Sequence, residues 1–200
     1  LAMEYVEGAT LEKNIENLLD GKQWKGIEGK NRTQMLRYYL GVLDIIGQLH
    51  DHGIIHRDIT PANFIVRADA GLVVIDFEMA YSMFQLLPDP PFVTGTIGYV
   101  SPEQVRCELP SPSHDVYSLG ALFLHMVTGL PPKNFKGKYS PAEIAEVLME
   151  QDVNKDLAST VADCFSEQTL ARPDIKTLKS AVMQVMYDLR FKQSDLSNKA

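Results

Sequence analysis

Apolar side chains recur at helical spacing along residues 32–52. Leu36, Leu40, Leu43 and Ile46 follow one another at steps of three or four residues. Because 3.6 residues make one helical turn, this spacing gathers the four side chains on one face of a helix. The pattern therefore predicts a long amphipathic helix that buries this face against a core.

Start signals and helical spacing predict further helices. Thr10 precedes a helical pattern over 10–20 and is placed as its N-cap. Two sequences, Ser-Pro-Glu-Gln at 101–104 and Ser-Pro-Ala-Glu at 140–143, have the order typical of a capping box. The apolar run at 118–130 is too short to span a bilayer and is expected to be a buried helix. The other helices are predicted near residues 115–128, 141–150, 155–165 and 173–191.

Short runs rich in β-branched residues predict the strands. The runs at 64–66 and 71–77 are separated by Arg-Ala-Asp-Ala-Gly, which is typical of a hairpin, and residues 1–6 also have strand composition. A proline-rich, irregular stretch follows at 86–98. The predicted fold class is therefore α+β and mainly α-helical: a helix, a small hairpin carrying polar residues, a long loop and a helical bundle in one domain.

Composition and charge narrow the classes of function. The chain has 200 residues, 45% of them hydrophobic, and a formal net charge of −7 at pH 7. Nucleic acids and anionic membranes attract basic surfaces, so neither partner is expected. Cys107 and Cys164 are the only cysteines and give no disulfide framework, so a reducing, cytoplasmic location fits best. The chain begins without methionine, and we expect it to come from a longer polypeptide.

Polar residues at fixed spacing occupy the predicted hairpin and the loop after it. His-Arg-Asp-Ile-Thr-Pro-Ala-Asn at 56–63 sets Asp58 and Asn63 five positions apart. Asp-Phe-Glu follows at 76–78, and Gly-Thr-Ile-Gly-Tyr-Val-Ser-Pro-Glu at 95–103. Alone, an aspartate or asparagine beside a proline most often forms a turn. Together, in this order and with the later His-Asp-Val-Tyr-Ser-Leu-Gly and Leu-Ala-Arg-Pro sequences, the motifs resemble the protein kinase superfamily.

The resemblance covers the hinge and the C-terminal lobe of a kinase. It implies a hinge at 1–8, a catalytic and activation segment at 54–103, and a helical subdomain at 104–200. The Gly-rich loop, strand lysine and helix glutamate of the N-terminal lobe have no counterpart here, so this missing lobe is an expected partner. The implied activity is phosphoryl transfer from ATP, with Mg²⁺, to Ser or Thr of a protein or peptide, and this chain alone is expected to be weakly active or inactive.

The same resemblance implies a role for each residue of the catalytic segment. Asp58 would orient the acceptor hydroxyl or accept its proton, while Asn63 and Asp76 would bind Mg²⁺, which prefers hard oxygen ligands. Glu78 stands where the glycine of Asp-Phe-Gly is usual; it would add a carboxylate near the metal and restrict the backbone there. Thr60 stands where Ser/Thr kinases carry a lysine, and Arg57 resembles the arginine that holds a phosphorylated activation loop.

Further residues match the nucleotide pocket and the supporting framework of kinases. Met3 resembles the gatekeeper, the backbone of Glu4 and Val6 would meet the adenine, and Leu11 and Ile65 would floor its pocket. The supporting residues are a stacked pair, His56 and Phe77; Asp115, which would anchor the catalytic-loop backbone; an ion pair, Glu103 with Arg172; and Thr96, which would contact the catalytic aspartate and favour Ser/Thr acceptors. Thr94 is a candidate phosphorylation site.

Three alternatives remain open at this point. Thr60 and Glu78 suit a pseudokinase that serves as an interaction module, yet Asp58, Asn63 and Asp76 are all retained. The same pair of departures resembles the kinase domains of class III and IV lanthipeptide synthetases, which phosphorylate a precursor peptide. Asp-Phe-Glu also resembles small-molecule kinases of the aminoglycoside and choline type, but those lack the sequence at 95–103.

Overall fold

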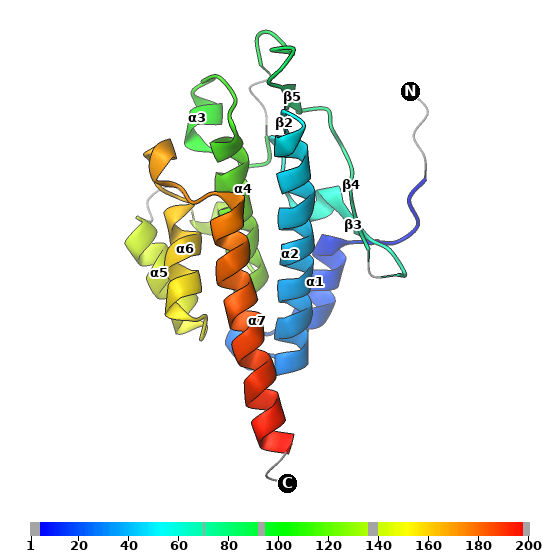
Figure 1. The fold of residues 1–200 in the computed structure, drawn as a ribbon, viewed down its shortest axis with the longest axis vertical. Coiled ribbons are helices and arrows are strands. Elements are labelled where there is room, and N and C mark those ends of the chain that lie inside the picture. Colours follow the sequence, from blue (N-terminus) through cyan, green and yellow to red (C-terminus); the bar gives the residue numbers. More distant parts are fainter. Residues whose placement is uncertain (1–4, 70, 92–94, 136–139, 198–200) are drawn as a thin grey trace.

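The computed structural model describes residues 5–69, 71–91, 95–135 and 140–197, the side chains of 190–197 excepted. Three long helices lie side by side along the molecule, with two shorter helices on one flank and a helix and small sheet on the other (Figure 1). The long helices are α2 (Gly29–Asp51), α4 (Pro112–Thr128) and α7 (Ile175–Ser197), and the shorter ones are α1 (Leu11–Leu19), α3 (Pro102–Val105), α5 (Pro141–Glu150) and α6 (Lys155–Asp163).

Two small antiparallel sheets complete the fold. The first has the order β1 (Ala9–Thr10), β3 (Phe64–Val66) and β4 (Leu72–Val74), and β3 and β4 form the predicted hairpin. The second pairs β2 (Ile54–Ile55) with β5 (Tyr81–Ser82). Short 3₁₀ turns link these elements: η1 (Trp24–Gly26), η2 (Pro61–Asn63), η3 (Pro132–Phe135) and η4 (Thr169–Ala171). The predicted fold class, α+β and mainly helical, is confirmed.

Helix α4 is the centre of the core. From Val116 to Thr128 every side chain except that of Tyr117 is buried, as expected for a helix whose surface is apolar on all sides. Phe123 packs between Trp24 and the edge of Tyr39, whose ring centroid lies 4.9 Å away. The apolar run at 118–130 is thus the buried helix that its composition predicted. No helix in the described ranges is long and apolar enough to cross a membrane.

Two of the predicted elements near the start of the chain differ from the structure. Helix α2 begins at Gly29, three residues before the predicted start. The predicted strand at 1–6 is not found over its described part, residues 5 and 6; residues 1–4 lie outside the described structure, and the first strand is β1.

The two predicted capping boxes have different outcomes. Ser140 and Glu143 exchange both hydrogen bonds, so this box is confirmed. Ser101 accepts from the backbone N–H of Gln104, but the Gln104 side chain donates to the Arg57 carbonyl at 3.0 Å instead of returning to Ser101. The second half of that box is therefore wrong, because a buried carbonyl from the catalytic segment takes the amide.

Candidate active site

The β3–β4 hairpin brings Asn63 and Asp76 to neighbouring strand ends. Phe64 pairs with Val74, and the N–H of Ile75 donates to the Asn63 carbonyl at 2.9 Å, which extends the ladder to the residues just outside the strands. Asp76 follows in the left-handed region, with φ 65°. A carboxylate and an amide oxygen at adjacent ends of a hairpin suit Mg²⁺, which completes its shell with water and phosphate.

Asp58 is held at both carboxylate oxygens. Oδ1 accepts from the backbone N–H of Thr96 at 3.0 Å and from its hydroxyl at 2.8 Å. Oδ2 accepts from the amide nitrogen of Asn63 at 2.9 Å, and the same nitrogen donates to the Asp58 carbonyl at 2.8 Å. Because its nitrogen is used on Asp58, Asn63 keeps its amide oxygen for a cation. Two sequence motifs, at 56–63 and 95–103, therefore converge on one carboxylate.

Asp115 fixes the backbone that leads to Asp58. This fully buried carboxylate accepts from the N–H of His56 at 2.9 Å and the N–H of Arg57 at 2.8 Å, and it contacts His50 Nε2 at 2.8 Å. Burial acts to raise the pKa of Asp115, but the hydrogen bond and charge of His50, with the other partners, hold it below its ordinary value. The negative charge therefore anchors two consecutive N–H groups, as the resemblance implied.

His56 and Arg57, which precede Asp58 in the chain, are both buried. Arg57 is 2% exposed, has φ 68° and donates from Nη1 to the Met79 carbonyl at 3.2 Å. It therefore ties the catalytic segment to the chain that follows Asp76, and burial lowers the pKa of its guanidinium. The ring of His56 lies 5.3 Å from the ring of Phe77 in a tilted arrangement, so these two predicted partners are in contact.

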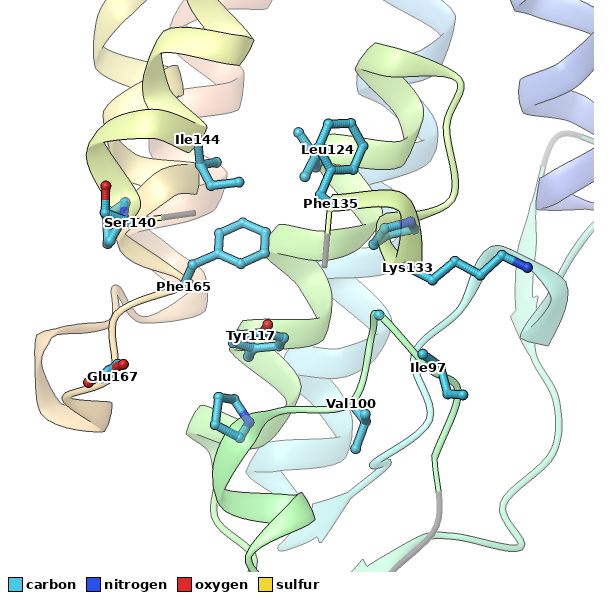
Figure 2. Close-up of a pocket in the computed structure, with 14 residues that line it drawn as sticks. Ile97, Val100, Tyr117, Leu124, Lys133, Phe135, Ser140, Ile144, Phe165 and Glu167 are labelled. Atoms are coloured by element: carbon cyan, nitrogen blue, oxygen red, sulfur yellow. The ribbon is translucent and has the colours of Figure 1, made fainter. Parts of the chain in front are cut away.

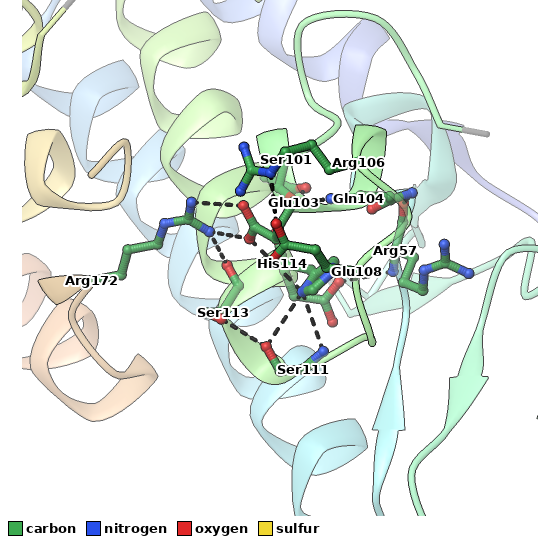
Figure 3. Close-up of polar contacts among 12 residues, drawn as sticks. Arg57, Ser101, Glu103, Gln104, Arg106, Glu108, Ser111, Ser113, His114 and Arg172 are labelled. Atoms are coloured by element: carbon green, nitrogen blue, oxygen red, sulfur yellow. Dashed lines mark hydrogen bonds and ion pairs between the residues drawn. The ribbon is translucent and has the colours of Figure 1, made fainter. Parts of the chain in front are cut away.

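Glu103 and Arg172 form a buried ion pair at the end of the activation segment (Figure 3). Both nitrogens of the Arg172 fork donate to the Glu103 carboxylate, the second at 2.9 Å to Oε2. Arg172 also donates to the Ser113 carbonyl at 2.7 Å and lies over the ring of Tyr117. Burial acts to raise the pKa of Glu103, but the Arg172 hydrogen bonds keep it below its ordinary value. The pair locks helix α3 to the segment before α7.

The two residues that depart from the kinase pattern differ in exposure. Thr60 is buried, and its carbonyl accepts from the Asn63 N–H at 3.1 Å, which closes the turn η2. Glu78 is exposed, and its N–H donates to Asp76 Oδ1 at 3.2 Å. Asp76 has a positive φ and Glu78 does not, so the backbone at 78 lies in a region that a side chain adopts without strain.

The predicted metal ligands are two carboxylates, of Asp76 and Glu78, and the amide oxygen of Asn63. Among the described residues, no group of three or more His, Cys, Asp or Glu side chains is arranged to hold a metal ion. A carboxylate cage that includes Glu78 is therefore absent from this part of the chain. The predicted set of Asn63, Asp76 and Glu78 holds only two carboxylates, so it stays a prediction.

The nucleotide side of the site is described only in part. Met3 and Glu4, like Thr94, lie outside the described residues. Val6 and Ile65 are half-buried and can offer surface to a ligand. Leu11 cannot, because it is fully buried in the core at the start of α1. Its predicted contact with the adenine is therefore wrong, and it supports β3 from within.

A mostly apolar pocket of about 640 Å³ adjoins the site (Figure 2). Ile97, next to Thr96, stands at its rim and is 71% exposed. The ring of Phe165 projects into it between Ile144 and Tyr117, whereas Lys133 extends away from these rings. The pocket therefore begins next to Thr96, the residue that donates to Asp58. Its apolar lining comprises Ile97, Val100, Leu124, Phe135, Ile144 and Phe165, with others.

The sequence motifs did not identify two histidines that support the site, His50 and His125. His50 follows Ile46 by four residues, so it extends the apolar face of α2 and meets Asp115 there. His125 interrupts the apolar run of α4 and contacts the hydroxyl of Tyr99. A polar residue on an otherwise buried face was the available signal in both cases, because such a group needs a partner.

Comparisons with known proteins agree with this geometry. The sequence model described as "Protein kinase domain" matches residues 1–196. Relatives include the serine/threonine-protein kinase PknB of Mycolicibacterium smegmatis, 34% identical over 155 residues, which are 76% of this chain and 23% of that protein. PknB of Mycobacterium leprae is 33% identical over 154 residues, 76% of this chain and 23% of that protein. The probable PknB of Bifidobacterium longum is 35% identical over 135 residues, 66% and 18% respectively. The matched region thus spans less than a quarter of these relatives.

Proposed function

This chain belongs to the protein kinase family, and we propose that it carries the catalytic and acceptor-binding half of a Ser/Thr kinase. The observation that supports this most is the arrangement around Asp58. Thr96 and Asn63 take one carboxylate oxygen each, so the side chain has one orientation. A carboxylate fixed at the surface beside metal ligands can align an acceptor hydroxyl with a phosphoryl group.

In the proposed reaction Asp58 accepts a hydrogen bond from the Ser or Thr hydroxyl and takes its proton as transfer proceeds. Mg²⁺ bound with ATP would neutralise the charge of the phosphates. Asp76 would bind this ion through its carboxylate and Asn63 through its amide oxygen. Thr60 supplies no positive charge at the position where related enzymes carry lysine, so more of the neutralisation falls to the metal.

The acceptor would lie across Thr96 and Ile97. Ile97 is exposed beside Asp58, and the apolar pocket begins at this residue. A peptide whose hydroxyl meets Asp58 can therefore bury an apolar side chain in the pocket, which favours a protein or peptide acceptor over a small sugar or amine. We further propose that the hinge and C-terminal lobe are formed by residues 1–200, and that a kinase N-terminal lobe covers ATP on the Val6 and Ile65 side.

Phosphotransfer from Mg-ATP by the native polypeptide in its full length tests this function. Asp58→Asn keeps the size of the side chain but removes the base, and the rate should fall by at least about a hundredfold. Asp51→Asn, at an exposed aspartate on α2, is the matched control and should keep the wild-type rate. An unchanged rate in Asp58→Asn would contradict the proposal. Mg-ATP binding with no transfer by the wild type would instead identify a kinase-like binding module.

A further inference from the structure

Tyr99 is fastened to helix α4 at both ends. Its hydroxyl lies 2.5 Å from Nδ1 of His125, and its carbonyl accepts from the hydroxyl of Ser118 at 2.7 Å. His125 and Ser118 lie two turns apart on α4, and all three residues are buried. The tyrosine is therefore held along its whole length against the most deeply buried helix of the protein. No motif of the sequence assigns a role to His125.

The fastened tyrosine determines the position of Thr96. The N–H groups of Tyr99 and Val100 both donate to the Thr96 carbonyl, at 2.9 and 3.0 Å, in a tight turn. On its other side Thr96 donates both its N–H and its hydroxyl to Asp58. A continuous series of hydrogen bonds thus runs from His125 through Tyr99 and Thr96 to Asp58.

The direction of the first bond follows from the charge states. Burial raises the pKa of Tyr99, so its hydroxyl keeps its hydrogen, and burial lowers the pKa of His125, so its ring is neutral near pH 7. The hydroxyl therefore donates to Nδ1, and the ring proton sits on Nε2. The charged groups near the pair are Glu12, which acts on Tyr99, and Glu16, which acts on His125; both are on α1 and both favour a proton on the pair.

We infer that His125 is a positioning residue for phosphoryl transfer: it holds Tyr99, and through Tyr99 and Thr96 it sets the orientation of Asp58. This inference rests on the function proposed above for Asp58. Protonation of His125 would turn Nδ1 into a donor. Tyr99 would then have no acceptor for its own hydrogen among the described residues, where His125 is its hydroxyl's partner. The orientation of Asp58 should therefore loosen as His125 becomes charged.

Three variants test the inference in the full-length polypeptide. His125→Leu and Tyr99→Phe each remove one partner, and each should lower kcat by about tenfold, the effect of one lost buried hydrogen bond, with KM for ATP unchanged. His125→Gln supplies a neutral acceptor at every pH. It should recover most of the lost kcat and remove the fall in kcat that we expect of the wild type at acid pH, where His125 takes up a proton. Wild-type kcat in His125→Leu, or the same acid fall in His125→Gln, would overturn the inference.

Two measurements separate this inference from the proposed function. Nitrogen NMR of the ring should show Nδ1 as an unprotonated acceptor near pH 7, and the Thr96 amide, protected by Asp58, should exchange faster in His125→Leu. Met126→Ala removes a buried side chain of α4 and keeps both His125 and Tyr99, so it is the control. It should change Thr96 exchange no more than its loss of global stability accounts for. Unaltered Thr96 exchange in His125→Leu contradicts the inference even if no phosphotransfer is detected in any variant.

Discussion

Thr96 donates two hydrogen bonds to a single carboxylate oxygen of Asp58, although the two residues are 38 positions apart. The second oxygen of Asp58 accepts from Asn63, five positions further along the chain. One carboxylate thus joins the loop at 56–63, which leads into the β3–β4 hairpin, to the segment at 95–103. The geometry of Asp58 depends on both contacts, because a carboxylate held at one oxygen alone can still rotate.

Replacement of Thr96 by valine tests how much this orientation matters. The variant keeps the backbone N–H bond but loses the hydroxyl, and a hydrogen bond to a charged group is worth about 1.5–3 kcal/mol, so kcat should fall roughly ten- to a hundredfold. Thr96→Ser retains the hydroxyl and is the matched control, with kcat close to wild type. Steady-state phosphotransfer at saturating ATP distinguishes the two. Equal kcat in both variants would mean that the hydroxyl does not orient Asp58.

Much of the fold could be predicted because local pattern and burial agree. The buried run of α4, the hairpin between β3 and β4, and the Ser140 capping box all follow from residues adjacent in sequence. The Gln104 side chain could not be assigned from sequence, since its partner is the carbonyl of Arg57, brought near by tertiary packing. Caps whose side chains face the interior are open to such competition from distant groups.

The site was predictable as a set of residues but not as a set of contacts. Order and spacing identified Asp58, Asn63 and Thr96, and the structure brings them together. Leu11 was wrongly assigned to the adenine pocket, because the sequence does not distinguish an apolar side chain that lines a pocket from one in the core. His125 belongs to no sequence motif, and only its burial in α4 shows that its ring needs a hydrogen-bond partner.

Asp115 should make stability depend on pH. The pKa of Asp115 is depressed in the folded protein. Its contribution to the free energy of unfolding is therefore complete above its unfolded pKa, about 3.9, and is lost as the pH falls through the folded pKa. Asp115→Asn leaves a buried N–H without an acceptor and should lower the free energy of unfolding by about 3–5 kcal/mol at pH 7. Urea unfolding of the wild type and the variant from pH 7 to pH 3 measures the pH dependence and the loss of stability. The difference between wild type and variant should shrink at the acid end, and a constant difference would contradict this assignment.

Loss of the two parallel guanidinium donors of Arg172 to Glu103 should destabilise the protein. Lysine at 172 presents a single ammonium instead of two parallel donors and leaves buried carbonyls unpaired, so Arg172→Lys should destabilise by about 2–4 kcal/mol. Arg106→Lys, at the exposed pair with Glu108, is the matched control and should change stability by less than about 1 kcal/mol. Chemical denaturation measures both variants. Equal effects would show that burial does not govern the pair at 172.

The metal site should depend on Asp76 far more than on Glu78. Asp76→Ala removes the carboxylate that fits Mg²⁺ and should abolish Mg-dependent ATP binding. Glu78 is exposed and belongs to no cluster of three or more His, Cys, Asp or Glu side chains among the described residues, so Glu78→Gln should shift the Mg²⁺ concentration for half-maximal binding by less than about threefold. Glu146→Gln, on the exposed face of α5, is the control. Titration calorimetry with Mg-ATP provides the comparison, and a loss of binding in Glu78→Gln would make Glu78 a ligand.

The pocket that begins at Ile97 should govern acceptor binding. Aspartate at 97 places a charge where an apolar acceptor side chain would be buried, and Ile97→Asp should raise KM for an acceptor peptide by about tenfold, as expected for about 1.5 kcal/mol of lost apolar contact. KM for ATP should not change, since the proposed nucleotide site is on the Val6 and Ile65 side. Leu170→Asp is the matched control, because Leu170 is fully exposed and lies outside the pocket. A rise in KM for ATP but not for peptide would place the acceptor elsewhere.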